Sequence, residues 1–183
     1  MEEIRNKELI KKIAQGEEEA FAVLYKEIRK DIFAFALSIL NNYHDAEDVM
    51  QEVFVKIKLQ AGTCENFENI NGWLIRVTKN TAVDLMRKKK AYVIDEELAK
   101  SGAHTGIHAK EESEVAEYSI FISELFSELK DEERQIVALH LISDLTHKTI
   151  AETLGLPLTT VKWRYRKAIL HLESISRKKE WEL

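Results

Sequence analysis

Residues 146–173 read THKTIAETLGLPLTTVKWRYRKAILHLE and contain the signals of two helices joined by a short turn. Thr146 is a suitable N-cap for the first helix. Gly155 supplies the left-handed residue that ends it, and Pro157 stands where the second helix begins, at a position that needs no amide donor. Two helices joined by a turn of about three residues that contains glycine predict a helix-turn-helix.

The second helix of this pair divides into an apolar face and a polar face. This division is typical of a recognition helix, whose outer residues reach base edges while neighbouring cations reach phosphates. The alternative is an ordinary solvated amphipathic helix, which the turn chemistry and the preceding helix disfavour. The residues expected to contact DNA are Thr159, Thr160, Lys162, Trp163, Arg164, Arg166 and Lys167.

The composition of the whole chain favours helices. Its 183 residues include only one proline and six glycines, which suits long helices and argues against a many-stranded β architecture. Helical periodicity runs through the first 90 residues and returns near the C-terminal domain. We therefore predict an all-α chain of two small helical domains, residues 1–90 and 119–183, joined by a flexible acidic linker at residues 91–118.

The net charge of −5 comes from the linker. Basic and acidic residues number 15 and 15 in residues 1–90, 2 and 7 in residues 91–118, and 10 and 10 in residues 119–183. The two domains carry concentrated basic runs, RKKK at 87–90 and KWRYRK at 162–167. Local fields decide what a surface attracts, so the overall acidity does not exclude nucleic-acid binding.

The sequence predicts a cytoplasmic protein that is not inserted into a membrane. Cys64 is the only cysteine, which excludes an intrachain disulfide, and no apolar signal-peptide core follows the charged N-terminus. The longest apolar stretch, residues 32–40, is far shorter than the roughly 20 residues of a membrane helix.

The sequence offers no sign of an enzyme. It has no glycine-rich phosphate loop and no triad-like arrangement, so we expect no catalytic residues and no cofactor. His104 and His108, with Glu111 and Glu112 nearby, are too weak a signal for a metal site inside a predicted linker. The other histidines are explained as ordinary helix positions.

Two helices of the N-terminal domain have unusual polar faces. The helix predicted at about residues 45–58 has an acidic edge beside its apolar face, which alone is weak evidence for a binding surface. The helix predicted at about residues 70–89 has a basic face with Trp73 at its border. An aromatic ring beside cations suits unstacked bases of single-stranded nucleic acid, and the alternative is a core residue near the rim.

Three segments together resemble one family, the bacterial RNA polymerase sigma factors of the extracytoplasmic-function (ECF) group, the smallest members of the sigma-70 class. DAEDVMQEVFVKI (45–57) resembles the segment that binds core RNA polymerase. FENINGWLIRVTKNTAVDLMRKKK (67–90) resembles the −10 recognition and melting segment. LKDEERQIVALHLISDLTHKTIAETLGLPLTTVKWRYRKAILHL (129–172) resembles the −35-binding domain, and the three segments occur in the family's order.

The resemblance implies a role for each matched residue. The second helix of the helix-turn-helix would lie in the major groove of the −35 element, and an anti-sigma factor is an expected partner. Core RNA polymerase would be contacted by Asp45, Asp48, Gln51 and Glu52. The partly single-stranded −10 element would be contacted by Trp73, Arg76, Lys79, Asn80, Arg87 and Lys88. The alternative function is a stand-alone helix-turn-helix activator with a helical sensor domain.

The chain departs from the family pattern at Trp163, where a small serine is usual. Our hypothesis is that Trp163 packs against a thymine methyl group or excludes some promoters by its size. The alternative is that Trp163 packs on a neighbouring helix or on an inhibitor and reads no base. A second departure is Thr149, which leaves the capping box of the first helix without its glutamate.

Overall fold

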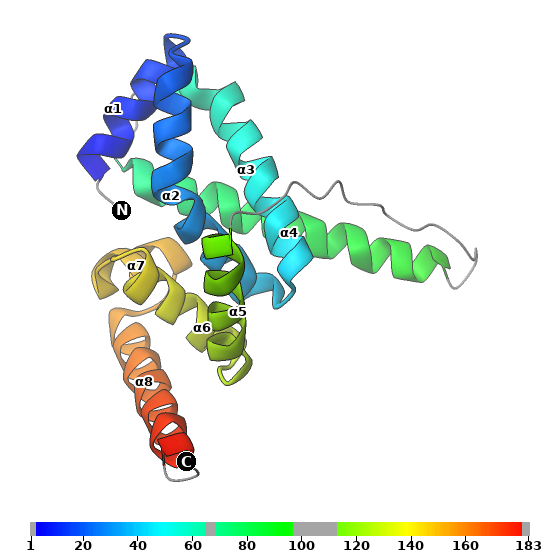
Figure 1. The fold of residues 1–183 in the computed structure, drawn as a ribbon, viewed down its shortest axis with the longest axis vertical. Helices are drawn as coiled ribbons and strands as arrows, with labels where there is room; N and C mark the ends of the chain where they lie inside the picture. The colour runs from blue at the N-terminus through cyan, green and yellow to red at the C-terminus, as the bar shows by residue number, and fades with distance from the viewer. Residues whose placement is uncertain (1–2, 65–68, 97–112, 181–183) are drawn as a thin grey trace.

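The computed structural model describes residues 3–64, 69–96 and 113–180, and every regular element in these ranges is a helix (Figure 1). The all-α prediction is therefore confirmed. No helix in these ranges is both long and apolar enough to cross a membrane. In chain order the elements are α1 (Glu3–Ala14), α2 (Glu18–Leu40), α3 (Tyr43–Cys64), α4 (Ile70–Glu96), α5 (Ser113–Ser127), α6 (Asp131–Val137), the π-helical turn η1 (Ala138–Ile142), α7 (His147–Leu154) and α8 (Leu158–Glu180).

The long apolar helix α2 ends at Leu40, and Asn41 is its C-cap. Asn41 is left-handed, with φ 49°, and its N–H donates to the Leu37 carbonyl oxygen at 2.8 Å. Asparagine tolerates this conformation better than most residues with a side chain. The chain therefore reverses at once, and α3 starts at Tyr43.

The linker predicted at residues 91–118 is too wide at both ends. Helix α4 continues to Glu96 and α5 begins at Ser113, so residues 91–96 and 113–118 are helical. No glycine or proline interrupts the sequence between Lys90 and Glu96, and helices extend until a terminating signal is reached. The central part of the predicted linker, residues 97–112, lies outside the described residues.

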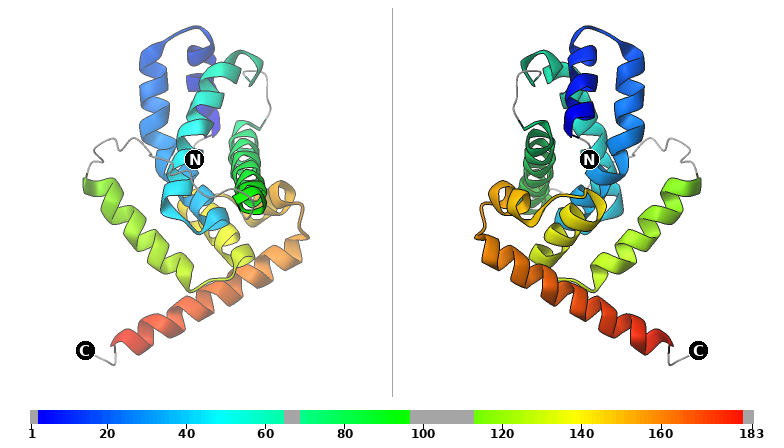
Figure 2. Two further views of the ribbon diagram at one scale, coloured as in Figure 1. Left: turned by 90° about the vertical axis from the view of Figure 1, so that its right-hand side faces the viewer. Right: turned by 90° about the vertical axis from the view of Figure 1, so that its left-hand side faces the viewer.

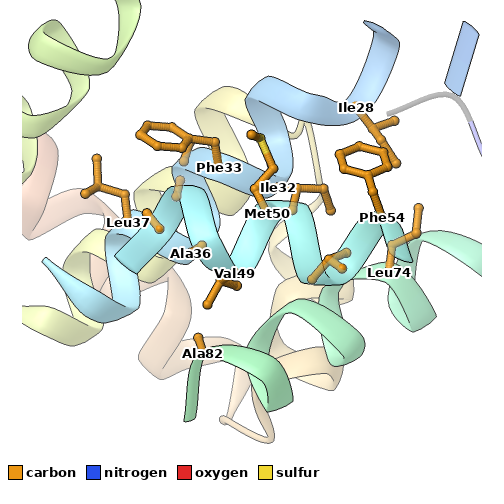
Figure 3. Close-up of a cluster of buried hydrophobic side chains, with 14 of the residues drawn as sticks. Ile28, Ile32, Phe33, Ala36, Leu37, Val49, Met50, Phe54, Leu74 and Ala82 are labelled. Carbon is orange, nitrogen blue, oxygen red and sulfur yellow. The ribbon is translucent and has the colours of Figure 1, made fainter. Parts of the chain in front are cut away.

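The core of the N-terminal domain forms where α3 packs between α2 and α4 (Figure 3). Met50 of α3 points toward Ile32 of α2, and Val49 points toward Ala82 of α4. The helical spacing of apolar residues on α3 produces this two-sided contact. Burial of the α3 face that the periodicity predicted is therefore confirmed.

The two domains pack against each other through a second apolar cluster. Phe35 of α2 and Ile75 of α4 enter it from the N-terminal domain, and both are almost completely buried. Figure 2 shows α7 beside α4 from opposite sides. This contact explains why the middle of α2 is apolar all round, because one side faces α3 and another faces the C-terminal domain. The C-terminal members of the cluster are Ile136, Leu139, Leu145, Ile150, Ala151 and Val161.

A buried guanidinium also joins the domains. Arg134 of α6 donates from Nε to the Ser38 carbonyl oxygen in the last turn of α2, at 3.3 Å. Its other nitrogens donate to the Leu129 carbonyl oxygen at 3.3 Å and to the Asp131 carboxylate at 2.5 Å. The C-terminus of a helix carries partial negative charge, so a cation is favourable there. Arg134 therefore ties α6 to the end of α2.

Candidate nucleic-acid interface

The helix-turn-helix forms as the sequence predicted. The Thr146 hydroxyl caps α7 by accepting a hydrogen bond from the Thr149 N–H at 3.2 Å. Gly155 is left-handed, with φ 69°, and the three residues 155–157 connect α7 to α8. A side chain at residue 155 would meet backbone strain and not crowding, since nothing lies within 4 Å of the place that a Cβ would occupy.

The outer face of α8 is open to solvent. Val161 and Ala168 on the opposite, apolar face are completely buried and fix the orientation of the helix. The exposed or half-buried positions on or beside the outer face are Thr159, Thr160, Lys162, Trp163, Arg164, Arg166 and Lys167. This face combines hydroxyl groups, four cations and one aromatic ring, which are groups able to meet phosphates and base edges.

Two of the cations predicted to contact DNA are paired within the domain. Arg164 donates to the Glu132 carboxylate at 2.6 Å, and Lys167 lies 3.2 Å from Glu133 Oε1. Both glutamates belong to the first turn of α6, which packs beside α8. Contact of Arg164 and Lys167 with DNA stays a prediction, and in this structure both side chains form ion pairs with α6. No spacing rule in the sequence links α6 to these two residues.

The Lys167 ammonium also connects Glu133 to Trp163. Lys167 Nζ lies 5.3 Å from the centroid of the Trp163 ring, within the range of a cation–π contact. Glu133 is buried, which raises its pKa, but hydrogen bonds from Lys167 and from the Lys130 N–H lower the pKa below its usual value. Glu133 is thus a carboxylate that holds Lys167, and Lys167 covers part of a ring that stays 62% exposed.

Two histidines meet behind the helix-turn-helix, although their sequence positions predicted only ordinary helix faces. The rings of His140 and His147 stack with centroids 4.2 Å apart, and Tyr165 of α8 contacts both rings edge-on at 4.6 and 4.8 Å. Burial, followed by the charges of His140 and Lys162, lowers the pKa of His147. The irregular segment after η1 separates the two histidines, so no helical spacing indicates this contact.

The basic face of α4 is present on the N-terminal domain. Arg76 and Asn80 are exposed and Lys79 is half-buried, so the three lie at the surface as predicted. Arg87 and Lys88 are exposed near the end of the described side chains of α4. The nearest acidic partner of Arg87 is Asp84, at 3.8 Å, which is a weak surface contact.

Trp73 does not lie at an exposed border, and this expectation is wrong for the structure. Its side chain is only 8% exposed and belongs to the core of the N-terminal domain. Residues 70–75, the first turns of α4, are all buried. Asn71 in this segment accepts a hydrogen bond from Asn6 of α1 at 2.9 Å, while Ile75 packs against the C-terminal domain. The start of α4 therefore has neighbours on its polar face as well as on the apolar face that its helical periodicity indicates.

The start of α4 is built by a close contact between Asn69 and Gly72. The Asn69 side-chain oxygen accepts a hydrogen bond from the Gly72 N–H at 2.6 Å and so caps the helix. A Cβ on residue 72 would lie 2.8 Å from that oxygen. Glycine at this position allows the capping side chain to approach.

The acidic edge of α3 is exposed at Asp48, Gln51 and Glu52. Asp45 differs, because it is mostly buried and forms an ion pair with Lys89 of α4. The family resemblance implied different partners for Asp45 and for the basic run of α4. The structure joins them across two helices.

Two exposed apolar residues continue the same face of α3. Val55 lies four residues after Gln51, and Leu59 lies four residues after Val55, so the three follow one helical stripe. Val55 is 57% exposed and Leu59 is 78% exposed. Helical periodicity did not predict Val55 and Leu59 as candidate site residues, because periodicity identifies the apolar face that packs in the core and not the apolar residues that stay exposed.

No group of three potential metal ligands occurs within the described ranges 3–64, 69–96 and 113–180. His104 and His108 lie outside these ranges, as do Glu111 and Glu112. The described surface carries three charged regions: a cationic outer face on α8, a cationic face on α4 and an acidic edge on α3.

Comparison with known proteins assigns each domain to a family. Residues 24–92 match Sigma-70 region 2, and residues 125–173 match Sigma-70, region 4. The chain is 29% identical over 174 residues to the ECF RNA polymerase sigma factor SigW of Bacillus subtilis. This alignment covers 90% of this chain and 93% of SigW. The chain is 31% identical over 146 residues to the RNA polymerase sigma factor SigV of the same species, covering 77% of this chain and 81% of SigV.

Solved structures share the fold. The sigma factor RpoE from Bartonella quintana, determined in complex with the anti-sigma factor NepR, is similar with a TM-score of 0.61 at 21% identity, over 86% of this chain and 96% of that one. CnrH, determined in complex with the cytosolic domain of CnrY, is similar with a TM-score of 0.61 at 20% identity, over 95% of this chain and 98% of that one.

Proposed function

This chain belongs to the extracytoplasmic-function group of sigma-70-class RNA polymerase sigma factors, and from that membership we propose which of its surfaces meets which partner. As a sigma factor it directs core RNA polymerase to specific promoters and assists promoter melting in transcription initiation. The alternative of a stand-alone activator is set aside by this membership. The observation that carries the proposal is that two exposed cationic faces lie on different domains, on α4 and on α8.

The outer face of α8 enters the major groove of the −35 element. Thr159, Thr160 and Trp163 face the base edges, while Lys162 and Arg166 reach phosphates on either side. Arg164 and Lys167 are ion-paired to α6, which favours a role in shaping this face over a direct contact with DNA.

The basic face of α4 binds the −10 element. Arg76, Lys79 and Asn80 contact the strand that separates from the duplex, and Arg87 and Lys88 hold phosphates beside it. Trp73 takes part only if the buried start of α4 becomes accessible, because a stacking platform has to offer its ring face.

Core RNA polymerase binds the exposed stripe of α3. Asp48, Gln51 and Glu52 supply the polar contacts, and Val55 and Leu59 supply apolar area beside them. A polar rim with buried apolar residues is the usual composition of a protein–protein interface. Asp45 acts differently, by holding Lys89 and thereby fixing the angle between α3 and α4.

The packed arrangement of the two domains belongs to the free factor and opens on polymerase. The −35 and −10 positions are roughly 25 base pairs apart, which is about 85 Å along B-form DNA. Helix α7 contacts α4 and is joined to α8 by only three residues, so the closed chain cannot place α4 and α8 on both elements. Polymerase binding therefore has to separate the domains.

We extend the proposal to three general properties. The factor acts by binding and carries out no bond chemistry, and it works in the cytoplasm beside the transcription machinery. An anti-sigma factor holds it inactive, a proposal supported by the similar structure of RpoE, which was determined in complex with the anti-sigma factor NepR.

The test is transcription in vitro with core RNA polymerase, with and without the chain, on a promoter library. We expect transcripts only when the chain is present. Lys162→Ala and Arg166→Ala should weaken initiation on every selected promoter and each reduce the salt dependence of binding by about one phosphate contact. Glu152→Ala, on the exposed surface of α7, is the matched control. Unchanged activity in the two cation variants would overturn the assignment of α8.

A further inference from the structure

Trp163 combines large exposure with a restrained position. It occupies the sixth position of α8, within the N-terminal part of a recognition helix that reaches base edges. Its side chain is 62% exposed, so it packs on no neighbouring helix in the manner of a core residue. The part of this aromatic ring that Lys167 leaves exposed is an apolar surface that a binding partner can cover.

The ring is braced from within the domain. Glu133 is buried at the start of α6 and holds the Lys167 ammonium at 3.2 Å, and that ammonium lies 5.3 Å from the centroid of the Trp163 ring. The Lys167 ammonium therefore contacts both the Glu133 carboxylate and the Trp163 ring. A group that is held in its bound position before binding loses less conformational freedom on association.

The chemistry of the ring limits what it can recognise. Indole offers two apolar faces and a single N–H donor. In the major groove, the apolar group that distinguishes one base from the others is the 5-methyl of thymine, while the remaining groups are hydrogen-bond donors and acceptors. An apolar ring facing the groove therefore favours a base pair that presents this methyl group.

We propose that Trp163 is a specificity-determining residue that selects thymine at one position of the −35 element by contact with its 5-methyl group. Lys167 is then a positioning residue for Trp163, and Glu133 positions Lys167. The proposal rests on the function proposed above, because it requires α8 to lie in the major groove.

The test uses the holoenzyme formed from core RNA polymerase and the full chain. A −35 element is first selected by this holoenzyme from a library randomised upstream of the −10 element. Each thymine of the selected element is then replaced by deoxyuridine, which removes only the methyl group. We expect one replacement to weaken promoter binding by about 4-fold, the loss of roughly one buried methyl group. Other thymines should tolerate the change.

Trp163→Ser should bind the thymine and deoxyuridine templates equally at that position, and Trp163→Phe should keep part of the preference. Because residue 163 is exposed, these variants should retain the wild-type circular dichroism and melting temperature. Equal binding of thymine and deoxyuridine templates by the wild type at every position would overturn the proposal. If the wild type failed to initiate on any template, the sigma-factor roles proposed for its surfaces would fail instead.

Lys167→Met separates positioning from phosphate contact. A positioning role predicts a smaller difference between thymine and deoxyuridine templates with an unchanged salt dependence, and Glu133→Gln should reproduce this result. A phosphate contact predicts equal weakening on both templates and a salt slope reduced by about one. Equal weakening with a reduced salt slope would overturn the claim that Lys167 positions Trp163.

Discussion

At the residue scale, we predict that buried His147 makes the C-terminal domain sensitive to acid. Burial beside His140 and Lys162 lowers the pKa of His147 below the 6.5 of an unfolded chain. The folded state therefore binds fewer protons than the unfolded state as the pH falls through 6.5. The stability that depends on neutral His147 is present above pH 6.5 and is lost on acidification below it.

We predict that His147→Phe removes this acid sensitivity while keeping the ring contacts. His147 Nε2 is buried and has no hydrogen-bond partner among the described residues, so phenylalanine sacrifices no bond at that atom. The measurement is urea unfolding of both proteins at pH 7.5 and pH 5.5. Burial raises the pKa of Asp31 to about 6, which favours the folded state on acidification, so the comparison with the variant is needed. An identical loss of stability in both proteins would contradict the role of His147.

Single residues also show where sequence reasoning ends. The caps at Thr146 and Gly155 follow from local chemistry and were predictable, because a helix end is decided by its own neighbours in sequence. The buried state of Trp73 was not, because it depends on how α4 packs into the core of the N-terminal domain. The pairs of Arg164 and Lys167 with α6 likewise depend on how two helices pack.

At the element scale, helix identities and their apolar faces were predictable, and their mutual contacts were not. The apolar middle of α2 is covered in one part by α3 and in another by the C-terminal domain, and only the structure shows this division. The linker limits at residues 91–118 failed because loss of apolar periodicity does not end a helix when no breaker is present.

The contact between α3 and α4 gives a prediction at this scale. If Asp45 serves mainly to hold Lys89, then Asp45→Asn and Lys89→Met should reduce polymerase binding by the same factor, and the double variant should be no worse than either. Partial exposure of this pair limits its contribution to stability to about 1 kcal/mol or less. The assay is competition for core polymerase. A defect in Asp45→Asn alone would instead indicate direct contact with polymerase.

At the scale of the whole molecule, Arg134 is the polar tie between the domains. Arg134→Met should lower the free energy of unfolding by about 2–3 kcal/mol, because it removes hydrogen bonds from a buried cation and leaves the Ser38 carbonyl oxygen without this donor. Arg134→Lys keeps the charge and should lose less. The free energies of unfolding of both variants are measured with denaturant. A loss below roughly 0.5 kcal/mol for Arg134→Met, the scale of an ordinary surface substitution, would contradict the role of Arg134 in joining the domains.

The closed arrangement links stability to activity. Burial of Phe35 and Ile75 against the C-terminal domain stabilises the free chain, while the proposed placement of α4 and α8 on two promoter elements requires the domains to part. On this proposal polymerase supplies the difference through its preference for the open state, since a ligand shifts an equilibrium only by its differential affinity.

The distance between the two domains distinguishes the closed arrangement from an open one. Spin labels at residues 26 and 173, both exposed, would be introduced through Lys26→Cys and Glu173→Cys in a chain that carries Cys64→Ser. Pulsed electron paramagnetic resonance should give one narrow distance in the free factor and a longer one after core polymerase is added. A distance that stays unchanged in a transcriptionally active complex would contradict the proposed opening, and a broad distribution in the free factor would contradict the closed form.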